Sequence, residues 1–254
     1  MRIAVAGGSG TVGRYAVLAA REAGHEVVPM SRTGGVDVRT GAGLADALSG
    51  VDVIIDAANA PSLNRAKATA FFTEVAGRLH EVGSAQGVSR IVIMSIVGLE
   101  RVPGYGYYEA KLAQEAAALA GPLPVSILRA TQFHEFPGQI LSRMSLGPLA
   151  LMPIMKVQSI AAREAGRALL EVAVNPPPGT TSEIAGPGPS DLVTLARAMV
   201  KARGTRTVVL PVPVPGPGGK AMRAEALLPT TGVRLAGPTF AEWLAGPDAA
   251  PLLH

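Results

Sequence analysis

The chain has 254 residues, of which 48% are hydrophobic, and a net charge of +4 that comes from scattered Lys and Arg residues. This composition supports a sizeable core and excludes a largely disordered chain. The absence of cysteine excludes disulfides and Cys-ligated zinc, and the four histidines lack metal-ligand spacing, so we expect no metal. Without a basic run or a bilayer-length apolar run, we expect a cytoplasmic protein with no nucleic-acid and no membrane partner.

Short runs rich in Val and Ile alternate with longer amphipathic stretches through the first 130 residues. Such runs are typical of buried parallel strands, which we expect at 3–7, 26–30, 51–58, 90–95 and 125–130, with a weaker one at 36–38. Helices are expected at about 12–23, 43–49, 64–86 and 107–120. This alternation predicts an α/β fold with a Rossmann-type doubly wound parallel sheet.

After residue 130 the pattern becomes irregular. The segment 137–160 carries several Leu and Met side chains between Gly and Pro, which fit an apolar lid, although core packing explains them almost as well. The stretch "PVPVPGPGG" (211–219) is predicted to be an exposed loop, because proline disrupts central strands and helices. The remaining expected elements are helices at 163–174, 190–202 and 239–246 and a strand at 181–186.

A glycine motif, "GGSGTVG", joins the first expected strand to the first expected helix. Between a strand and a helix, this motif predicts a dinucleotide site, because bare backbone can approach a pyrophosphate and the helix N-terminus offers N–H groups. A structural turn without a ligand is the alternative. The residues expected to bind the phosphates are Gly7, Ser9, Gly10, Thr11 and Val12, with Gly13 allowing the helix to approach the strand.

Ser31 and Arg32 follow the second strand, where NAD-binding sites usually have an acidic residue for the ribose 2′-hydroxyl. An arginine would instead pair with a 2′-phosphate, so we expect NADP(H), with an ordinary surface arginine as the alternative. Five residues at the ends of the next two strands are expected along the cofactor: Asp37 and Val38 beside the adenine, and Ala57, Ala58 and Asn59 along its backbone.

A Tyr-x-x-x-Lys spacing, formed by Tyr107 and Lys111, lies shortly after Ser95 at the end of a strand. Positions i and i+4 share a helix face, so Lys111 can favour the ionised phenol and also bind the nicotinamide ribose. Tyr107 would then give a proton to a carbonyl oxygen held by Ser95 while hydride arrives at the carbon. Tyr108 is a rival proton donor, and a surface pair of Lys111 with Glu115 is the structural alternative.

The motifs "VAGGSGTVG", "VDVIIDAAN", "RIVIMSIVG", "YYEAK" and "PVSILRATQFHEF" resemble the atypical short-chain dehydrogenase/reductase superfamily, and within it the NmrA-like NAD(P)H-binding proteins. The resemblance implies one NAD(P)-binding domain over 1–254, with a small C-terminal substrate lobe mainly from 131–165 and 181–254. It also implies nicotinamide contacts from Thr131, Gln132 and Phe133. Many members lack the catalytic tyrosine, and some act as sensors without turnover.

These observations predict an NADP(H)-dependent oxidoreductase acting on a small, largely apolar carbonyl or enone. The alternatives are a non-catalytic NADP(H)-sensing regulator and a cofactor-dependent isomerase or epimerase. Tyr108, His134 and Met152 are expected to contact the substrate, although His134 satisfied by neighbouring backbone is an equal alternative. Monomer and homodimer both remain open.

Overall fold

A seven-stranded sheet has the strand order β12-β9-β5-β4-β3-β1-β2. The computed structural model describes residues 1–177 and 179–253, so the last residue of the expected substrate lobe lies outside it. The pairs of β1 with β2 and β3, and of β3 with β4, are parallel. The strands are β1 Arg2–Ala6, β2 Glu26–Met30, β3 Val53–Asp56, β4 Arg90–Ile96, β5 Val125–Ala130, β9 Thr181–Ala185 and β12 Arg234–Leu235.

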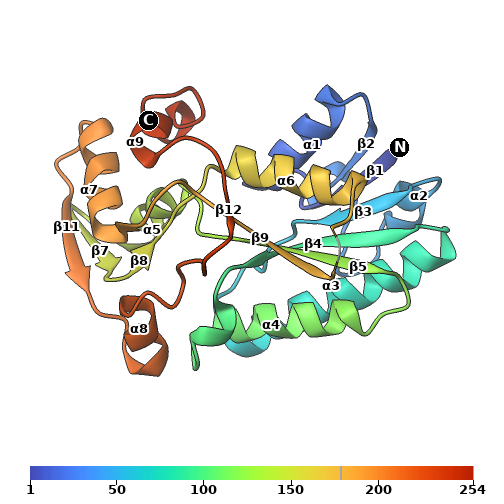
Figure 1. The fold of residues 1–254 in the computed structure, drawn as a ribbon, viewed down its shortest axis with the longest axis horizontal. Helices are drawn as coiled ribbons and strands as arrows, with labels where there is room; N and C mark the ends of the chain where they lie inside the picture. The colour runs from blue at the N-terminus through green and yellow to red at the C-terminus, as the bar shows by residue number, and fades with distance from the viewer. Residues whose placement is uncertain (178, 254) are drawn as a thin grey trace. The chain divides into compact units, whose positions relative to one another are not determined.

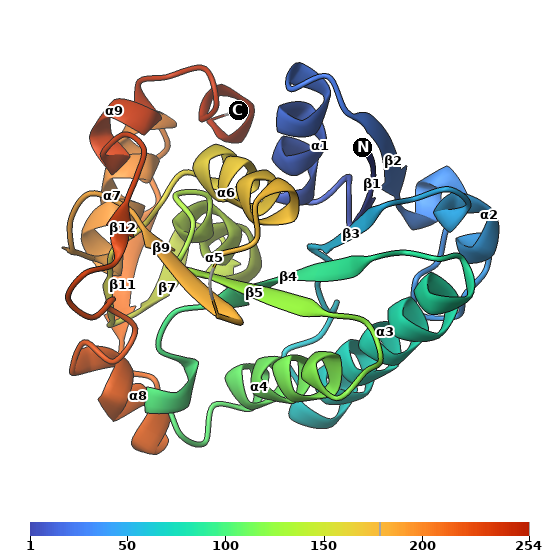
Figure 2. The same ribbon diagram turned by 45° about the vertical axis from the view of Figure 1, so that its right-hand side comes forward.

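The chain forms two compact units, the first made of residues 1–96, 106–129 and 163–183. Its helices are α1 Gly13–Glu22, α2 Leu44–Leu48, α3 Arg65–Ala85, α4 Gly106–Leu119 and α6 Ala162–Val174. Helices α1 and α6 cover one face of the strands, and α3 and α4 cover the other, as both ribbon views show (Figures 1 and 2). The predicted doubly wound α/β fold is thus confirmed.

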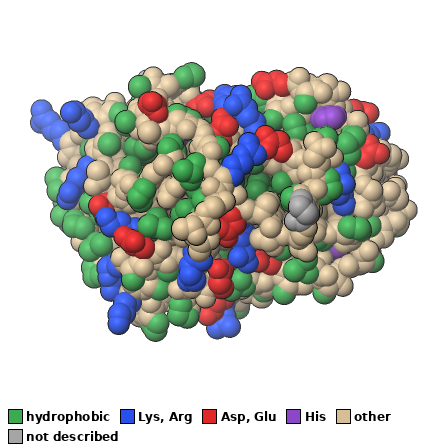
Figure 3. Space-filling view, in the orientation of Figure 1, with side chains coloured by type: hydrophobic (Ala, Val, Ile, Leu, Met, Phe, Trp, Pro, Cys, Tyr) green, Lys and Arg blue, Asp and Glu red, His purple; other side chains and the backbone are tan. Residues whose placement is uncertain are grey.

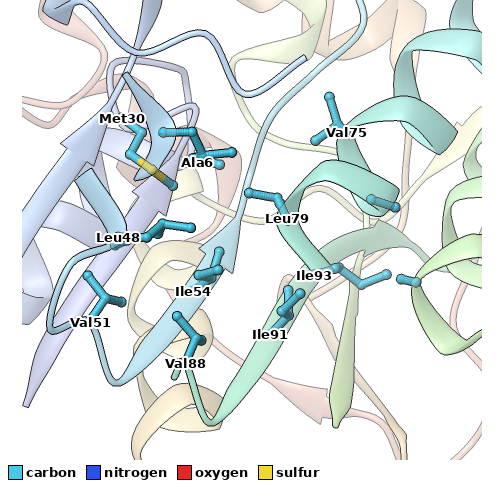
Figure 4. Packing of buried hydrophobic residues seen from close by; sticks show 14 of the residues in the cluster. Ala6, Met30, Leu48, Val51, Ile54, Val75, Leu79, Val88, Ile91 and Ile93 are labelled. Atoms are coloured by element: carbon cyan, nitrogen blue, oxygen red, sulfur yellow. The ribbon is translucent and has the colours of Figure 1, made fainter. Parts of the chain in front are cut away.

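Aliphatic side chains from the strands and from α2 and α3 form the core of the first unit. Ile54 and Ile91 lie on adjacent strands and meet Leu79 of α3, while Leu48 brings in α2 (Figure 4). All four residues of β3 are buried, as the run of Val and Ile predicts for a strand with helices on both sides.

The expected strand at 36–38 was wrong, because this segment forms a turn. A 3-10 helix, η1 (Arg32–Gly34), follows β2, and Gly35 ends it with φ +83°. The carboxylate of Asp37 then accepts hydrogen bonds from the backbone N–H groups of Arg39 and Thr40. A short polar side chain that bonds its own backbone in this way competes with strand formation.

The second unit consists of residues 97–105, 130–162 and the chain from 184 on. It contains a three-stranded sheet of order β11-β7-β6 and an antiparallel pair, β10 with β8. Its elements are η2 Leu99–Arg101, α5 Phe136–Met144, β6 Ser145–Leu146, β7 Leu149–Pro153, β8 Lys156–Val157, β10 Ser190–Asp191, α7 Leu192–Ala202, β11 Val208–Val212, α8 Gly216–Arg223, α9 Phe240–Leu244 and η3 Ala250–Leu252.

The exposed loop expected at 211–219 was also wrong. Strand β11 continues to Val212, and α8 begins at Gly216. Pro211 is tolerated because β11 is an edge strand, where a missing N–H costs no ladder hydrogen bond. A proline in the first turn of α8 is tolerated for a similar reason, since the N–H groups there have no partner within the helix.

Candidate functional site

The glycine loop after β1 leaves no room for side chains at two of its glycines. Gly7 has φ +70°, and a Cβ there would lie 2.7 Å from the carbonyl oxygen of Ala57. A Cβ on Gly13 would overlap the carbonyl of Gly7. At Gly10 the nearest atom is the Gly7 oxygen at 3.1 Å, and φ is ordinary, so the fold itself hardly requires glycine there. A ligand against the backbone would explain that glycine.

Helix α1 begins at the end of this loop without a side-chain cap. Val12 is the N-cap residue, and its side chain is buried and makes no capping hydrogen bond. Ser9 and Gly10 are exposed, and the Gly8 N–H donates to the carbonyl of Met30, which ties the loop to the end of β2. An uncapped helix N-terminus beside a tight glycine turn is suited to a phosphate.

Arg32 follows β2 as the first residue of η1. Its side chain is exposed, and no described residue forms an ion pair or hydrogen bond with it. Ser31 instead uses its hydroxyl locally, since Oγ accepts from the Gly34 N–H at 3.2 Å. The arginine thus remains available for a phosphate, while the serine shapes the turn that carries it.

Asp37 and Val38 have local structural roles. The Asp37 carboxylate accepts from two backbone N–H groups of its own turn. The side chain of Val38 packs against the aliphatic core of the first unit. Their position beside an adenine stays a prediction.

The segment after β3 connects the glycine loop with α4. The Ala57 N–H donates to Ala6, and its carbonyl faces Gly7. The Ala58 N–H donates to the buried carboxylate of Asp56 at 3.0 Å. Asn59 Oδ1 accepts the hydroxyl of Tyr107 at 2.6 Å. This short segment therefore touches both the loop expected to hold the phosphates and the expected proton donor.

Lys111 is buried in a polar network. Its Nζ donates to the carbonyl of Met94 at 2.7 Å and to Oε1 of Gln114, and it lies 4.7 Å from the ring centre of Phe72. Gln114 Nε2 donates in turn to Asp56 at 2.8 Å. An ammonium group has three N–H donors, so one is left for a ribose hydroxyl. The burial of Lys111 contradicts the structural alternative of a surface pair with Glu115.

Burial controls the ionisation of this network. Desolvation lowers the pKa of Lys111 to about 8, although the nearby carboxylates of Asp56 and Glu115 favour its charged form. Desolvation likewise raises the pKa of Asp56, against the opposing effect of the Ala58 N–H. Sequence reasoning missed Asp56 and Gln114. The sequence offered only weak signals for them. Asp56 ends an expected strand, and Gln114 lies about one helical turn after Lys111.

The hydroxyl of Ser95, which was expected to hold a substrate oxygen, forms a hydrogen bond within the protein. This hydroxyl donates to Glu115 at 2.5 Å, and both side chains are buried. Arg129 holds the same carboxylate with two hydrogen bonds, from Nε at 3.0 Å and from a terminal nitrogen at 2.7 Å. A substrate oxygen would have to displace Glu115 to receive the Ser95 proton.

The two candidate tyrosines of α4 differ in exposure. Tyr107 is half-buried, and its ring lies edge-on to Phe72 and to Tyr108, with centroids 6.0 and 6.1 Å away. Tyr108 is buried. Tyr107 and Lys111 thus both contact Phe72 from the same helix, and the hydroxyl of Tyr107 reaches the segment after β3.

The segment after β5 fixes its backbone but leaves buried side-chain atoms without partners. The Thr131 N–H donates to Ile184, and Gln132 and His134 pair through their backbones with Ile160, next to Phe133. Thr131 Oγ1 and both polar atoms of the Gln132 amide are buried, and no described residue forms a hydrogen bond with them. Such atoms are costly unless a ligand or water satisfies them.

His134 is fully buried in the second unit. Its Nε2 faces the carbonyl of Pro238 at 3.1 Å and must be the donor, so Nδ1 accepts from the hydroxyl of Ser159 at 2.8 Å. Desolvation lowers its pKa to about 4, and the rings of Phe240 and Trp243 pack against it. Both ring nitrogens of His134 therefore bond to neighbouring groups. This geometry favours a structural role for His134 over contact with a substrate.

The segment expected to be an apolar lid is divided between core and surface. Met152 and Met155 are buried, whereas Leu149 and Leu151 are exposed. Core packing therefore accounts for Met152, and the proposed substrate site does not include it.

A pocket of about 280 Å³ lies within the second unit. Ser159, which bonds His134, lines it together with Phe240. No lining residue is charged; the others are Pro187, Gly188, Pro189, Ser190, Leu195, Thr239 and Ala241. In the described part of the chain, no group of three acidic or histidine side chains could hold a metal ion, and no helix is long and apolar enough to cross a bilayer.

Comparison with known proteins identifies the fold. No protein-family model and no curated protein matches the sequence. A short-chain dehydrogenase/reductase superfamily protein from Agrobacterium tumefaciens with bound NAD is similar over 99% of this chain and 97% of its own, at 20% identity and TM-score 0.70. The fold is Rossmann-like and matches neighbours of this type.

Two further neighbours show the range of chemistry on this fold. MoeE5 in complex with UDP-glucose and NAD matches over 98% of this chain and 97% of its own, at 18% identity and TM-score 0.73. An NADPH-dependent quinone oxidoreductase from Escherichia coli matches over 96% and 98%, at 16% identity and TM-score 0.63. The neighbours include NAD(P)-dependent oxidoreductases, epimerases and dehydratases, and they bind NAD or NADPH-type cofactors.

Proposed function

We propose that the protein is a cytoplasmic NADPH-dependent oxidoreductase of NmrA-like type that reduces a small, largely apolar carbonyl or enone. The observation that carries this proposal is the connection of Lys111, Tyr107 and the glycine loop through one segment after β3. Asp56 accepts a hydrogen bond from the Ala58 N–H of that segment. It also accepts one from Gln114, which itself accepts a hydrogen bond from Lys111. Asn59 receives the hydroxyl of Tyr107.

The residues present fit a nicotinamide dinucleotide. Gly7 and Gly13 cannot carry a side chain, the N-terminus of α1 has no side-chain cap, and Arg32 is exposed for a 2′-phosphate. The unsatisfied amide of Gln132 and hydroxyl of Thr131 have the complementarity that a carboxamide requires. Phe133, between them and His134, would pack against the ring.

The cofactor, when bound, supplies the hydride to the substrate carbon. Tyr107 Oη would give its proton to the carbonyl oxygen, and the positive charge of Lys111 favours the phenolate left behind. The third N–H of Lys111 would hold a ribose hydroxyl. The single phenolic proton points to Asn59 Oδ1 in the free protein, so Tyr107 would have to turn this proton from Asn59 to the substrate oxygen.

Ser95 enters this mechanism as a donor to the substrate oxygen only if it leaves Glu115. A hydrogen bond to a buried carboxylate, itself held by Arg129, is a strong competitor for that proton. This contact favours a second candidate function, a regulator that binds NADP(H) without turnover. The cofactor-dependent epimerase remains an alternative because some neighbours carry that activity.

The substrate class follows from the sequence-based prediction. The pocket of the second unit, lined by hydroxyl groups and apolar side chains, is compatible with a small neutral molecule.

A substitution at Tyr107 tests the proposal. A screen of ketones, enones and quinones with NADPH would identify a substrate, and Tyr107→Phe should then lower turnover about a hundredfold or more, the usual effect of losing a positioned proton donor. Tyr108→Phe is the matched control and should keep turnover within a few-fold of the wild type. NADPH affinity, measured by calorimetry, should be unchanged in both variants. Tight NADPH binding with no turnover across the screen would favour the regulator.

A further inference from the structure

A buried polar chain joins Lys111 of α4 to the end of β3. Its three side chains, Lys111, Gln114 and Asp56, are at most 5% exposed. The ammonium group of Lys111 donates to Gln114 Oε1, and Gln114 Nε2 donates to Asp56 Oδ2 at 2.8 Å. The other carboxylate oxygen of Asp56 accepts the Ala58 N–H at 3.0 Å. Many other charged side chains lie on the face seen in Figure 3, where water screens them, whereas this chain is shielded from water.

The donors and acceptors of this chain place a negative charge at the end opposite the lysine. An ammonium group only donates, so it faces the amide oxygen of Gln114, and the amide nitrogen is left to point at Asp56. Both oxygens of Asp56 therefore accept hydrogen bonds, one from Gln114 and one from the Ala58 N–H. A carboxylate accepts at both oxygens, whereas a protonated carboxyl needs an acceptor for its own proton. The chain thus runs from a cation to an anion through a neutral amide.

The surroundings of Lys111 favour its charged form, and burial opposes it. The carbonyl of Met94 accepts from Nζ at 2.7 Å, and Nζ lies 4.7 Å from the ring centre of Phe72. Both groups attract a cation. Desolvation lowers the pKa of Lys111 to about 8, and the carboxylates that oppose this effect are Asp56 and, to a smaller extent, Glu115. The charge of Lys111 at neutral pH therefore depends on these two anions.

Glu115 is already balanced by another cation, whereas Asp56 is not. Arg129 makes two hydrogen bonds to the Glu115 carboxylate, and Ser95 makes a third. The cation that acts on Asp56 is Lys111. Desolvation raises the pKa of Asp56, and the Ala58 N–H, the charge of Lys111 and the Gln114 amide oppose this effect. Lys111 and Asp56 thus stabilise each other's charge against the cost of burial.

We propose that Asp56 is a positioning residue for Lys111: through Gln114, its carboxylate fixes the place of the ammonium group and balances its charge. Its part in the reaction rests on the proposed function, in which the charge of Lys111 favours the phenolate of Tyr107. The hydrogen bonds of Asp56 are to Ala58 and Gln114, so it acts on the lysine through the amide. An amide does not exchange its protons in this way, so the effect is one of charge and geometry and not of proton transfer.

Titration of Lys111 in the free protein tests the proposal without a substrate or cofactor. In protein labelled with ¹³C-lysine, the Cε signal that is missing from Lys111→Met reports the charge of Lys111. We expect a pKa of about 8 in the wild type, and a titration midpoint at least one pH unit lower in Asp56→Asn, the effect of removing one opposite charge. Asp52→Asn, at an exposed aspartate just before β3, is the matched control and should leave the midpoint unchanged. An equal midpoint in the wild type and Asp56→Asn would overturn the proposal.

A double variant keeps the test decisive if Asp56→Asn does not fold. Loss of Asp56 alone leaves the lysine buried without its counter-charge, whereas Asp56→Asn combined with Lys111→Met removes both charges. The double variant should therefore fold and have a higher thermal midpoint than Asp56→Asn. A double variant no more stable than Asp56→Asn would contradict a charge pair.

Turnover separates this inference from the proposed function. With a substrate from the screen, the loss of turnover at alkaline pH should begin at least one pH unit lower in Asp56→Asn than in the wild type and in Asp52→Asn. If Tyr107→Phe keeps full turnover, the proposed function fails, while a lowered Lys111 midpoint in Asp56→Asn still supports the positioning role. If Tyr107→Phe loses turnover and Asp56→Asn shifts neither the midpoint nor the pH profile, the proposed function stands and Asp56 is only structural.

Discussion

Gly10 distinguishes a ligand-binding glycine from a structural one. A Cβ at Gly7 or Gly13 would collide with backbone, so substitution there should lower the free energy of unfolding by about 1–3 kcal/mol whether or not a ligand binds. At Gly10 only the Gly7 oxygen is near, at 3.1 Å. Gly10→Val should therefore leave thermal stability nearly unchanged and abolish NADP(H) binding in calorimetry. Gly77→Val, at an open helix position, is the control for the added side chain. Unchanged affinity in Gly10→Val would contradict a pyrophosphate at this loop.

The ionisation of Lys111 makes stability depend on pH. Its pKa is about 8 in the folded protein, because burial opposes its charge, and about 10.4 in an unfolded chain. Between these values the unfolded chain binds more protons, so the free energy of unfolding rises with pH. From pH 7.5 to 9.5 this group should add about 2 kcal/mol. Denaturant unfolding at the two pH values should show the gain in the wild type and not in Lys111→Met.

The exposed Lys201 supplies the control for this experiment. Lys201→Met should keep the pH dependence of the wild type, since this substitution leaves the buried network of Lys111 intact. If Lys111→Met shows the same rise in stability as the wild type, the rise comes from other groups, and Lys111 is not the buried amine that the network implies.

Some site residues could be predicted from the sequence and others could not. The glycine motif between a predicted strand and a predicted helix pointed to Gly7 and Gly13, whose tight packing the structure shows, because the turn and the helix approach are local. The phosphate contact of Gly10 stays a prediction. Lys111 bonds Met94 of β4 directly, and Gln114 of its own helix links it to Asp56 of β3. Only the folded chain shows that these strands meet at the lysine. A pattern of letters likewise does not show that the hydroxyl of Ser95 is held by Glu115.

At the scale of elements, Val and Ile runs predicted the parallel strands because burial on both faces leaves a continuous apolar signature. The prediction from the sequence was wrong in two segments whose residues are compatible with more than one backbone conformation. The 211–219 stretch contains prolines that are permitted at a sheet edge and in a first helical turn, and neither context can be recognised without the neighbouring strand. At 36–38 the run Val-Asp-Val resembles a strand, but it forms a turn in which the Asp37 carboxylate accepts a hydrogen bond from the Arg39 N–H.

The 3-10 helix η1 determines where Arg32 lies, and it carries a prediction about cofactor choice. A charge-assisted pair with a 2′-phosphate contributes about 1.5–3 kcal/mol, or roughly ten- to a hundredfold in affinity. Arg32→Ala should therefore weaken NADP(H) by that factor and leave NAD(H) unchanged, as measured by calorimetry. Arg21→Ala, at an exposed arginine in the last turn of α1, should change neither affinity. Equal affinities for the two cofactors in the wild type would remove the support for an NADP site.

At the scale of the whole molecule, the proposed cofactor contacts fall into two groups that can be tested separately. The glycine loop and Arg32 are expected at the adenosine end, and Thr131 and Gln132 at the nicotinamide end. The adenosine fragment 2′,5′-ADP carries the 2′-phosphate without the nicotinamide. It should therefore report on the adenosine-end contacts alone, whereas NADP⁺ should report on both groups.

Gln132→Ala tests the expected contact at the nicotinamide end of the cofactor. The amide of Gln132 has no partner within the described chain, so its removal should not destabilise the free protein. It should weaken NADP⁺ about tenfold, the effect of one lost hydrogen bond of about 1.4 kcal/mol, and leave 2′,5′-ADP unaffected. Arg32→Ala is the complementary variant and should weaken both ligands. At a hundredfold excess over its dissociation constant, NADP⁺ should stabilise the wild type by about 2.7 kcal/mol, which thermal unfolding measures directly. If Gln132→Ala weakens both ligands, or neither, the segment after β5 does not hold the nicotinamide.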